Sequence, residues 1–167
     1  MKKLDNNYYE WLINNDFIVV EGTKAIIENG KYNYWDSWGV RDISILTHKG
    51  GLFYRNGKEL VSYFTGSKKQ GSIQQTGRAI SNDDGETWFK NPLLPVLENS
   101  KNDWDSEVAA TSWVIKKKNS YFLYYRGSRS ACFNDSIGLA ISSDGISFKK
   151  FCENPILNAS DFKGIRN

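Results

Sequence analysis

The chain has 167 residues, 40% of them hydrophobic and 14% aromatic, which is enough to bury the core of one globular domain. Its net charge is +3, from 22 basic and 19 acidic residues (22 − 19), and the two signs are interspersed. This distribution argues against a nucleic-acid or membrane-surface partner. The N-terminus lacks the apolar stretch of a secretory signal, and no apolar run approaches membrane-spanning length. We therefore expect a cytoplasmic protein.

Metal and cofactor signals are absent from the sequence pattern. The two cysteines, Cys132 and Cys152, do not have the spacing of metal ligands, and the one histidine, His48, cannot build a zinc site with them. We expect reduced thiols, no metal and no cofactor.

The N-terminal residues allow two interpretations. The first is a short helix over 5–14 that begins at Asp5 or Asn6. The second is that Trp11 and the apolar run after it match Trp88 and the run that follows it. In that case the segment 1–34 completes a unit of the repeat that occupies the rest of the chain.

From residue 35 onward the sequence repeats itself. The matching blocks are 35–46 with 104–115, 63–67 with 124–128, and 77–81 with 138–142. The last two pairs share a shift of 61 residues (127 − 66 and 138 − 77). An ordered series of matches at a near-constant shift indicates a true structural repeat.

The pattern of each repeat unit predicts four short antiparallel strands. They are expected at 40–47, 59–65, 77–81 and from Trp88 in the first unit, and at 108–116, 121–126, 137–142 and from Phe148 in the second. An Asp-Gly turn precedes each fourth strand. Such units at a spacing of roughly 60 residues are typical of β-propeller blades. A two-sheet sandwich could use the same strands but would not need so regular a repeat.

The turn blocks resemble particular propeller families. Residues 81–88 match the Asp-box of sialidase-like propellers, Ser-x-Asp-x-Gly-x-Thr-Trp, at every fixed position. Residues 137–148 with 154–157 resemble the five-bladed propeller glycosidases of families 43, 32, 62, 68 and 130. The stretch 40–45 resembles their Val-Arg-Asp-Pro-Ser-Ile first-blade strand, although Ile43 replaces the proline. The resemblance covers nearly the whole chain and implies an all-β fold of propeller blades.

The expected domain is a single partial propeller over 1–167. Its first blade spans about 35–100 and its second about 104–160, with 1–34 completing another blade and 161–167 beginning the next. Five such units would need about 300 residues. We therefore expect a fragment of a larger protein, or a half that completes its fold by association; we favour the fragment. An incomplete ring exposes sheet edges, which allows self-association.

Recurrence separates structural from functional candidates. The recurring pairs are Trp35/Trp104, Asp36/Asp105, Ser37/Ser106, Gly66/Gly127 and Asp84/Asp144. Every blade needs these residues, so we expect them to serve packing and turn formation. With Val40 aligned to Val108, Asp42 falls opposite Ala110 and has no twin. Asp42 is therefore the better functional candidate.

Glycoside hydrolysis requires two carboxyl groups across the scissile bond. The resemblance implies that Asp42 is the base or nucleophile and that the acid comes from a later blade. Glu107 is the only nearby substitute. The candidate substrate-binding residues are Trp38, Arg41, Glu107, Trp113 and Arg126. The aromatic ones could stack on a sugar ring and the arginines could bind hydroxyl or carboxylate groups, but blade packing and surface ion pairs account for them equally well.

Three functions remain open at this stage. The first is a glycoside hydrolase that acts on or binds carbohydrate, with an incomplete catalytic set in this chain and hence no appreciable turnover by the chain alone. The second is a sialidase-like Asp-box propeller. The third is a non-catalytic propeller that binds carbohydrate or another protein.

Overall fold

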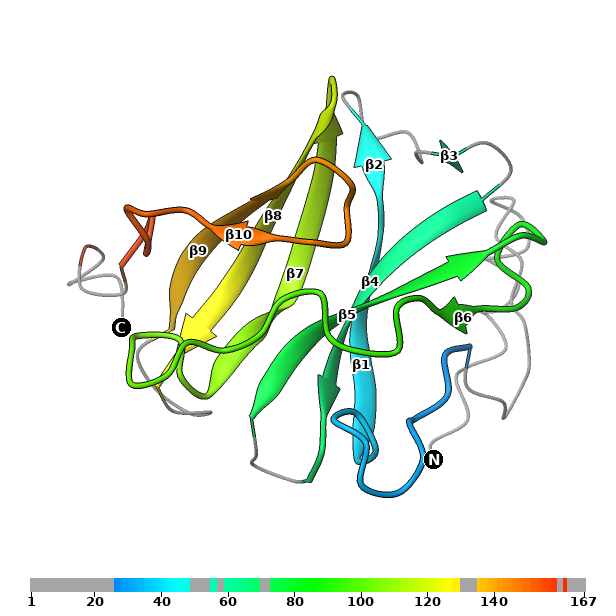
Figure 1. The fold of residues 1–167 in the computed structure, drawn as a ribbon, viewed down its shortest axis with the longest axis horizontal. Helices are drawn as coiled ribbons and strands as arrows, with labels where there is room; N and C mark the ends of the chain where they lie inside the picture. Colours follow the sequence, from blue (N-terminus) through cyan, green and yellow to red (C-terminus); the bar gives the residue numbers. More distant parts are fainter. Residues whose placement is uncertain are drawn as a thin grey trace, which may run out of the picture.

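The structure is a computed structural model that describes residues 26–48, 55–56, 59–69, 73–129, 135–158 and 161. Within these ranges the chain forms one sheet of ten strands and contains no α-helix (Figure 1). The expected helix over 5–14, the N-terminal match to the repeat and the residues after 161 lie outside the described residues. The all-β fold predicted from the repeat is confirmed for the described part.

The ten-stranded sheet consists of two four-stranded antiparallel sheets that follow one another along the chain and are joined by short parallel ladders (Figure 1). The first consists of β1 (Gly39–Ile45), β4 (Glu59–Ser67), β5 (Gln74–Ser81) and β6 (Phe89–Lys90), and the second of β7 (Val108–Lys117), β8 (Ser120–Ser128), β9 (Ser136–Ser142) and β10 (Lys149–Lys150). The short β2 (Thr47–His48) and β3 (Arg55–Asn56) pair with β7 and β4. These sheets are two β-propeller blades, hereafter blade 1 and blade 2.

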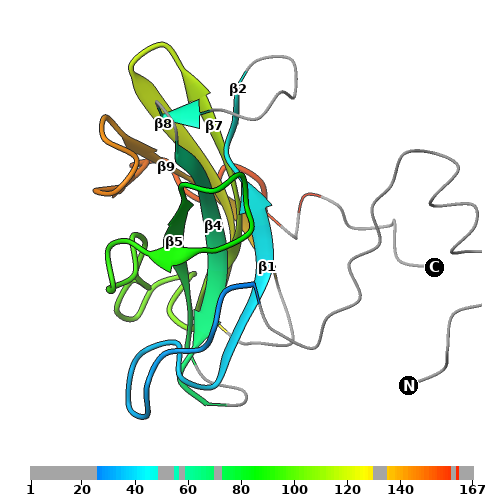
Figure 2. The same cartoon turned by 90° about the vertical axis from the view of Figure 1, so that its right-hand side faces the viewer.

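The blades join side by side through two short parallel ladders, β5 with β7 and β2 with β7. Figure 2 shows β4 between β1 and β5, in the order of the pairing. Buried hydrogen bonds cross the junction: the Tyr63 hydroxyl donates to the carbonyl oxygen of Gly145 at 2.8 Å, and the Ser44 hydroxyl to that of Ser112 at 2.8 Å. The apolar core takes side chains from both blades, including Leu46, Tyr63, Val114, Leu123 and Tyr125.

A buried aspartate precedes the first strand of each blade and contacts a lysine on the fourth. Asp36 pairs with Lys90 and Asp105 with Lys150, and the two carboxylate side chains are only 2% and 0% exposed. The Tyr125 hydroxyl also donates to Asp105 at 3.0 Å. Burial, together with the charge of Asp105, raises the pKa of Tyr125, so the hydroxyl stays protonated and acts as the donor.

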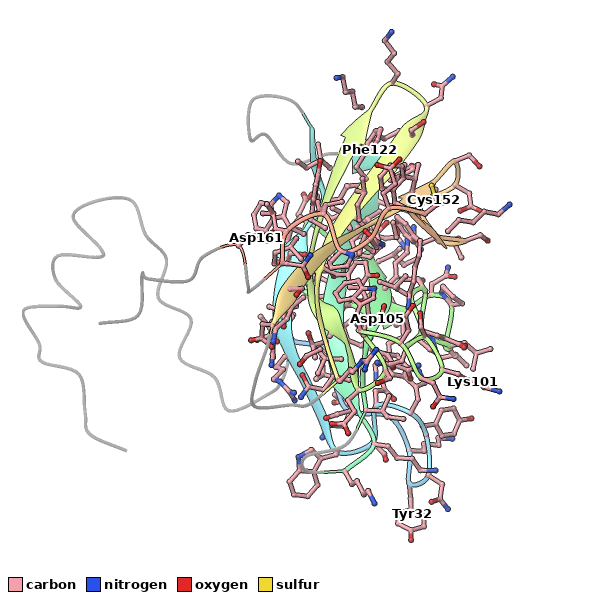
Figure 3. The ribbon with its side chains drawn as sticks, turned by 90° about the vertical axis from the view of Figure 1, so that its left-hand side faces the viewer. Tyr32, Lys101, Asp105, Phe122, Cys152 and Asp161 are labelled. Atoms are coloured by element: carbon pink, nitrogen blue, oxygen red, sulfur yellow. The ribbon has the colours of Figure 1, made fainter. Side chains whose placement is uncertain are left out.

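A tryptophan beside each aspartate packs on the second strand of its blade. The Trp35 ring stacks on Phe64 with centroids 5.8 Å apart, and Trp104 lies on Tyr125 at 5.6 Å. Figure 3 shows Asp105 within the body of the molecule. The structural role predicted from recurrence therefore holds for these residues.

The turns before the fourth strands correct one detail of the repeat. The Ser81 hydroxyl donates to Asp83 at 2.7 Å, and the Ser142 hydroxyl to Asp144 at 2.7 Å. The counterpart of Asp144 is therefore Asp83, not Asp84. The first turn is one residue longer, so matching the two Asp-Gly pairs selected the wrong aspartate.

Gly66 provides a steric test of how the Trp35 segment packs on β4. A Cβ atom at Gly66 would lie 2.2 Å from Cζ3 of Trp35, so Gly66→Ala must displace the ring or the strand. Overpacking of this kind costs about 1–3 kcal/mol, and we expect that loss of unfolding free energy in urea denaturation. At Gly39 an added Cβ meets nothing closer than 3.7 Å, so Gly39→Ala should change stability by less than about 0.5 kcal/mol. Equal stabilities of the two variants would contradict the observed packing.

Asp83 provides a pH-dependent test of the first turn. Donation by the Thr87 hydroxyl, then by the Thr87 backbone N–H and the Ser81 hydroxyl, lowers the pKa of Asp83 from 3.8 to about 2. A carboxylate with a lowered folded-state pKa stabilises the protein above its unfolded-state pKa and loses that contribution as pH falls through the folded-state value. The stability difference between wild type and Asp83→Asn, measured by urea denaturation, should therefore shrink as pH falls from about 4 to about 2. A difference that stays constant over this range would show that the carboxylate does not accept these hydrogen bonds.

Candidate functional site

Asp42 and Thr111 occupy the same place in the two blades. Gly39 pairs with Ser67 and Val108 with Ser128, and each first strand then contains a β-bulge. Because 111 − 42 equals 104 − 35, the register follows the tryptophan pair. The alignment that set Asp42 opposite Ala110 was one residue out of register.

The bulges hold both residues in an unusual backbone conformation. The φ angles of Asp42 and Thr111 are 52° and 49°, in the left-handed region that residues with a Cβ rarely adopt, β-branched residues least of all. Interactions between the blades accompany this strain. The Thr111 hydroxyl donates to Oδ2 of Asp42 at 3.2 Å, and its backbone N–H donates to the Thr65 hydroxyl at 2.9 Å. The two bulges therefore place one residue of each blade in contact.

Asp42 is accessible to solvent. Its side chain is 39% exposed, and the Arg41 Nε lies 3.8 Å from Oδ2 of Asp42. Arg41 in turn donates to the Ser67 hydroxyl at 3.4 Å. Asp36 contrasts with Asp42, because its carboxylate is buried and paired with Lys90. Of Asp36 and Asp42, Asp42 is the one that a ligand could reach.

A groove of about 1060 Å³ opens where β1 and β7 begin. Residues from both blades line it, among them Tyr32, Trp38, Lys68, Lys69, Ile73 and Glu107. Trp38 is 54% exposed and Tyr32 is 90% exposed, so both rings face solvent. Figure 3 shows Tyr32 at the end of the molecule opposite Phe122. Glu107 is the blade 2 counterpart of Trp38, since 107 − 38 is again 69.

Backbone hydrogen bonds fix both walls of the groove. In blade 1, the Trp38 N–H donates to the carbonyl oxygen of Ser67 at 2.9 Å. In blade 2, the Glu107 N–H donates to that of Ser128 at 3.0 Å, and the Gln74 N–H donates to that of Glu107 at 2.8 Å. These bonds fix the strand ends at which Trp38 and Glu107 line the groove.

The remaining sequence candidates lie elsewhere. Because Tyr125 packs against Trp104, the alternation along β8 turns Tyr124 and Arg126 toward the opposite face of blade 2. Trp113 pairs with Tyr124 and is 52% exposed. Arg126 forms an ion pair with Asp135 at 2.9 Å. The structure thus brings Trp38 and Glu107 together in the groove and joins Arg41 to Asp42, but Trp113 and Arg126 are not groove-lining residues.

Sequence reasoning did not find Tyr32, Lys68, Ile73 or Thr111. Lys68 was missed because β4 continues to Ser67 instead of ending at the predicted residue 65. Because Gly39 pairs with Ser67 at the end of the ladder, Trp38 and Lys68 both lie directly beyond it. Tyr32 and Ile73 gave no signal in the sequence, since their position depends on how loops from different parts of blade 1 meet.

No metal or membrane feature is found in the part of the chain that the structure describes. There, no group of three His, Cys, Asp or Glu side chains could hold a metal ion. Nor does any helix in these residues have the length and apolar character needed to cross a membrane. Cys152 is an exposed free thiol, and Cys132 lies outside the described residues.

Solved structures of glycoside hydrolases share the fold of this chain. A family 117 glycoside hydrolase from the marine bacterium Zobellia galactanivorans matches with a TM-score of 0.63 and 19% identity, over 79% of this chain and 37% of that one. A structure described as a glycoside hydrolase matches with a TM-score of 0.57 and 12% identity, over 89% and 45%.

A third match comes from the family 130 mannoside phosphorylases and hydrolases that target β-1,2-mannosidic linkages in Candida mannan. Its TM-score is 0.60 and its identity 15%, over 79% of this chain and 39% of that one. No family model and no curated protein matches the sequence. The chain thus shares the β-propeller fold and spans about two-fifths of the length of these structures.

The contrast between Asp36 and Asp42 leads to a paired prediction. Asp36→Asn would leave Lys90 without its charged partner, and removing one member of a buried pair costs about 3–5 kcal/mol. We expect a loss near the lower end, because the Lys90 side chain keeps 14% exposure. Asp42→Asn should cost less than about 1 kcal/mol. Thermal and urea unfolding of the two variants would measure the difference, and the reverse order would show that the two roles are exchanged.

Proposed function

We propose that this chain forms the substrate-binding part of a propeller glycoside hydrolase, with Asp42 as the base or nucleophile. One observation carries the proposal: an exposed carboxylate occupies the strained bulge where two blades meet, and the same bulge of blade 2 holds Thr111. A strained residue at the contact between elements is a common feature of functional sites. The fold shared with glycoside hydrolases supports the assignment.

The groove supplies the binding chemistry in this proposal. The exposed rings of Trp38 and Tyr32 offer apolar faces on which the C–H face of a sugar ring packs. Glu107 and Gln75 add polar groups that fix the orientation of hydroxyls. A few polar groups on a largely apolar, concave surface are typical of small-molecule sites.

Glu107 fits substrate binding better than acid catalysis. It lies four residues before Thr111, the residue that contacts Asp42. At about 3.3 Å per residue, the backbone of Glu107 is about 13 Å from the bulge. The two carboxyl groups of a glycosidase are about 5–5.5 Å apart in retaining enzymes and about 6.5–9.5 Å apart in inverting ones. We therefore assign the acid to a group other than Glu107.

Non-catalytic saccharide binding is the second candidate function. It is favoured by one observation, that Trp38 and Glu107 line the groove whereas Asp42 does not. The sialidase-like alternative gains no comparable support. Asp83, the aspartate of the Asp-box match, accepts hydrogen bonds from Ser81 and Thr87 within its own turn. These bonds give Asp83 a structural role in the turn.

The test is an assay of the full chain against aryl glycosides and oligosaccharides, with turnover and binding measured separately. We expect saccharide binding without appreciable turnover, because Asp42 lacks an acid partner in Glu107. Turnover that survives Asp42→Ala would remove Asp42 from the mechanism. Turnover abolished by Glu107→Gln would identify Glu107 as the acid.

A matched pair of aromatic variants controls the binding measurement. Trp38→Ala should weaken binding by about tenfold or more, as expected for loss of a stacking platform. Phe89 is similarly exposed, at 60%, but lies on β6 and does not line the groove. Phe89→Ala should therefore leave binding within about twofold of wild type. Equal effects of the two substitutions would exclude the groove as the saccharide site.

A further inference from the structure

We infer that the groove selects anionic oligosaccharides, in which an acidic substituent lies beside the stacked sugar ring. This inference rests on the proposed saccharide site and names its ligand class. The observation behind it is the charge of the lining: Lys68 and Lys69 contribute two cations and Glu107 one anion, a balance of +1 (2 − 1).

Strand pairing places a cation next to the aromatic platform. Gly39 pairs with Ser67 at the end of the ladder, so Trp38 and Lys68 are the residues directly beyond the last pair. Two contacts hold this arrangement: the Trp38 N–H donates to the carbonyl oxygen of Ser67, and the Ser37 hydroxyl donates to that of Lys68 at 3.3 Å. The backbone of Lys68 is thus held beside the strand end that carries Trp38, and both side chains line the groove.

Blade 2 has the same strand ends with different chemistry. There Glu107 replaces Trp38, and Arg129 replaces Lys68, since 129 − 68 is 61. The Arg129 Nε donates to the carbonyl oxygen of Asp103 at 3.2 Å, and Arg129 does not line the groove. The groove therefore has a cationic, aromatic wall from blade 1 facing a wall with a single carboxylate from blade 2.

This asymmetry favours an acidic sugar over a neutral one. A neutral saccharide would stack on Trp38 and offer only hydroxyl groups to the two ammonium groups. A carboxylate or sulfate on the ring would instead form charge-assisted hydrogen bonds, which are roughly twice as strong as neutral ones. Glu107, on the opposite wall, repels the same anion and accepts hydroxyl donors, so the acidic group is directed toward blade 1.

The experiment measures binding of the full chain to tetragalacturonate, to the same oligomer after carboxyl reduction, and to a sulfated oligosaccharide. We expect at least one anionic ligand to bind about tenfold or more tightly than the neutral one at about 20 mM salt, with the advantage shrinking at about 500 mM. Whether the carboxylated or the sulfated ligand binds more tightly identifies the acidic group. Lys68→Glu should remove the advantage, so that the ratio of the anionic to the neutral dissociation constant approaches one.

Lys117→Glu is the matched control, because Lys117 is an exposed residue at the far end of β7 from the groove. It makes the same charge reversal and should leave all affinities within about twofold. Equal affinity for acidic and neutral ligands, or equal effects of the two lysine variants, would overturn the inference and leave the saccharide site intact. Absence of binding to every saccharide would overturn the proposed function as well.

Discussion

The buried aspartate–lysine pair ties the start of each blade to its last strand, and the position of the candidate site depends on it. Burying two charges is costly unless they are paired, so Asp36 fixes its backbone at the point where Lys90 can reach it. The lysine ammonium also lies 5.7 Å from the centroid of the Phe64 ring, which adds a cation–π contact. Trp38 and Asp42 follow Asp36 within six residues (42 − 36). The pair therefore sets where the groove wall and the exposed carboxylate lie.

The contact between the blades makes the strained bulges possible. A threonine with positive φ costs of order 1–3 kcal/mol, and it persists only when its surroundings fix it in place. Thr111 is held by Thr65 through its backbone N–H and by Asp42 through its hydroxyl, so both restraints come from blade 1. The orientation of Asp42 thus depends on blade 2 as well as on its own strand.

The sequence predicted the blades because their signals are local and repeated. Strand alternation, the Asp-Gly turns and the shift of 61 residues located the four strands of each blade close to where they are observed. The register of the first strand was wrong because Val40 was matched to Val108 by residue type, whereas the spacing of Trp35 and Trp104 gives the observed pairing. A slip of one residue exchanges the two faces of a strand. Here the slip meant that Thr111 was not recognised as the counterpart of Asp42. The groove could not be predicted either, because it depends on packing between separate loops that no local pattern encodes.

The two blades share the residues that hold each sheet together and differ in the residues that line the groove. The tryptophan, aspartate and lysine that hold each blade together recur at equivalent positions. At the groove, Trp38 corresponds to Glu107 and Lys68 to Arg129, so one wall is aromatic and cationic while the other presents a carboxylate. Under the proposed function, walls of different chemistry would bind the two sides of a saccharide differently and hold it in one orientation, and a catalytic carboxylate can act on one chosen bond only if the ligand is held in this way.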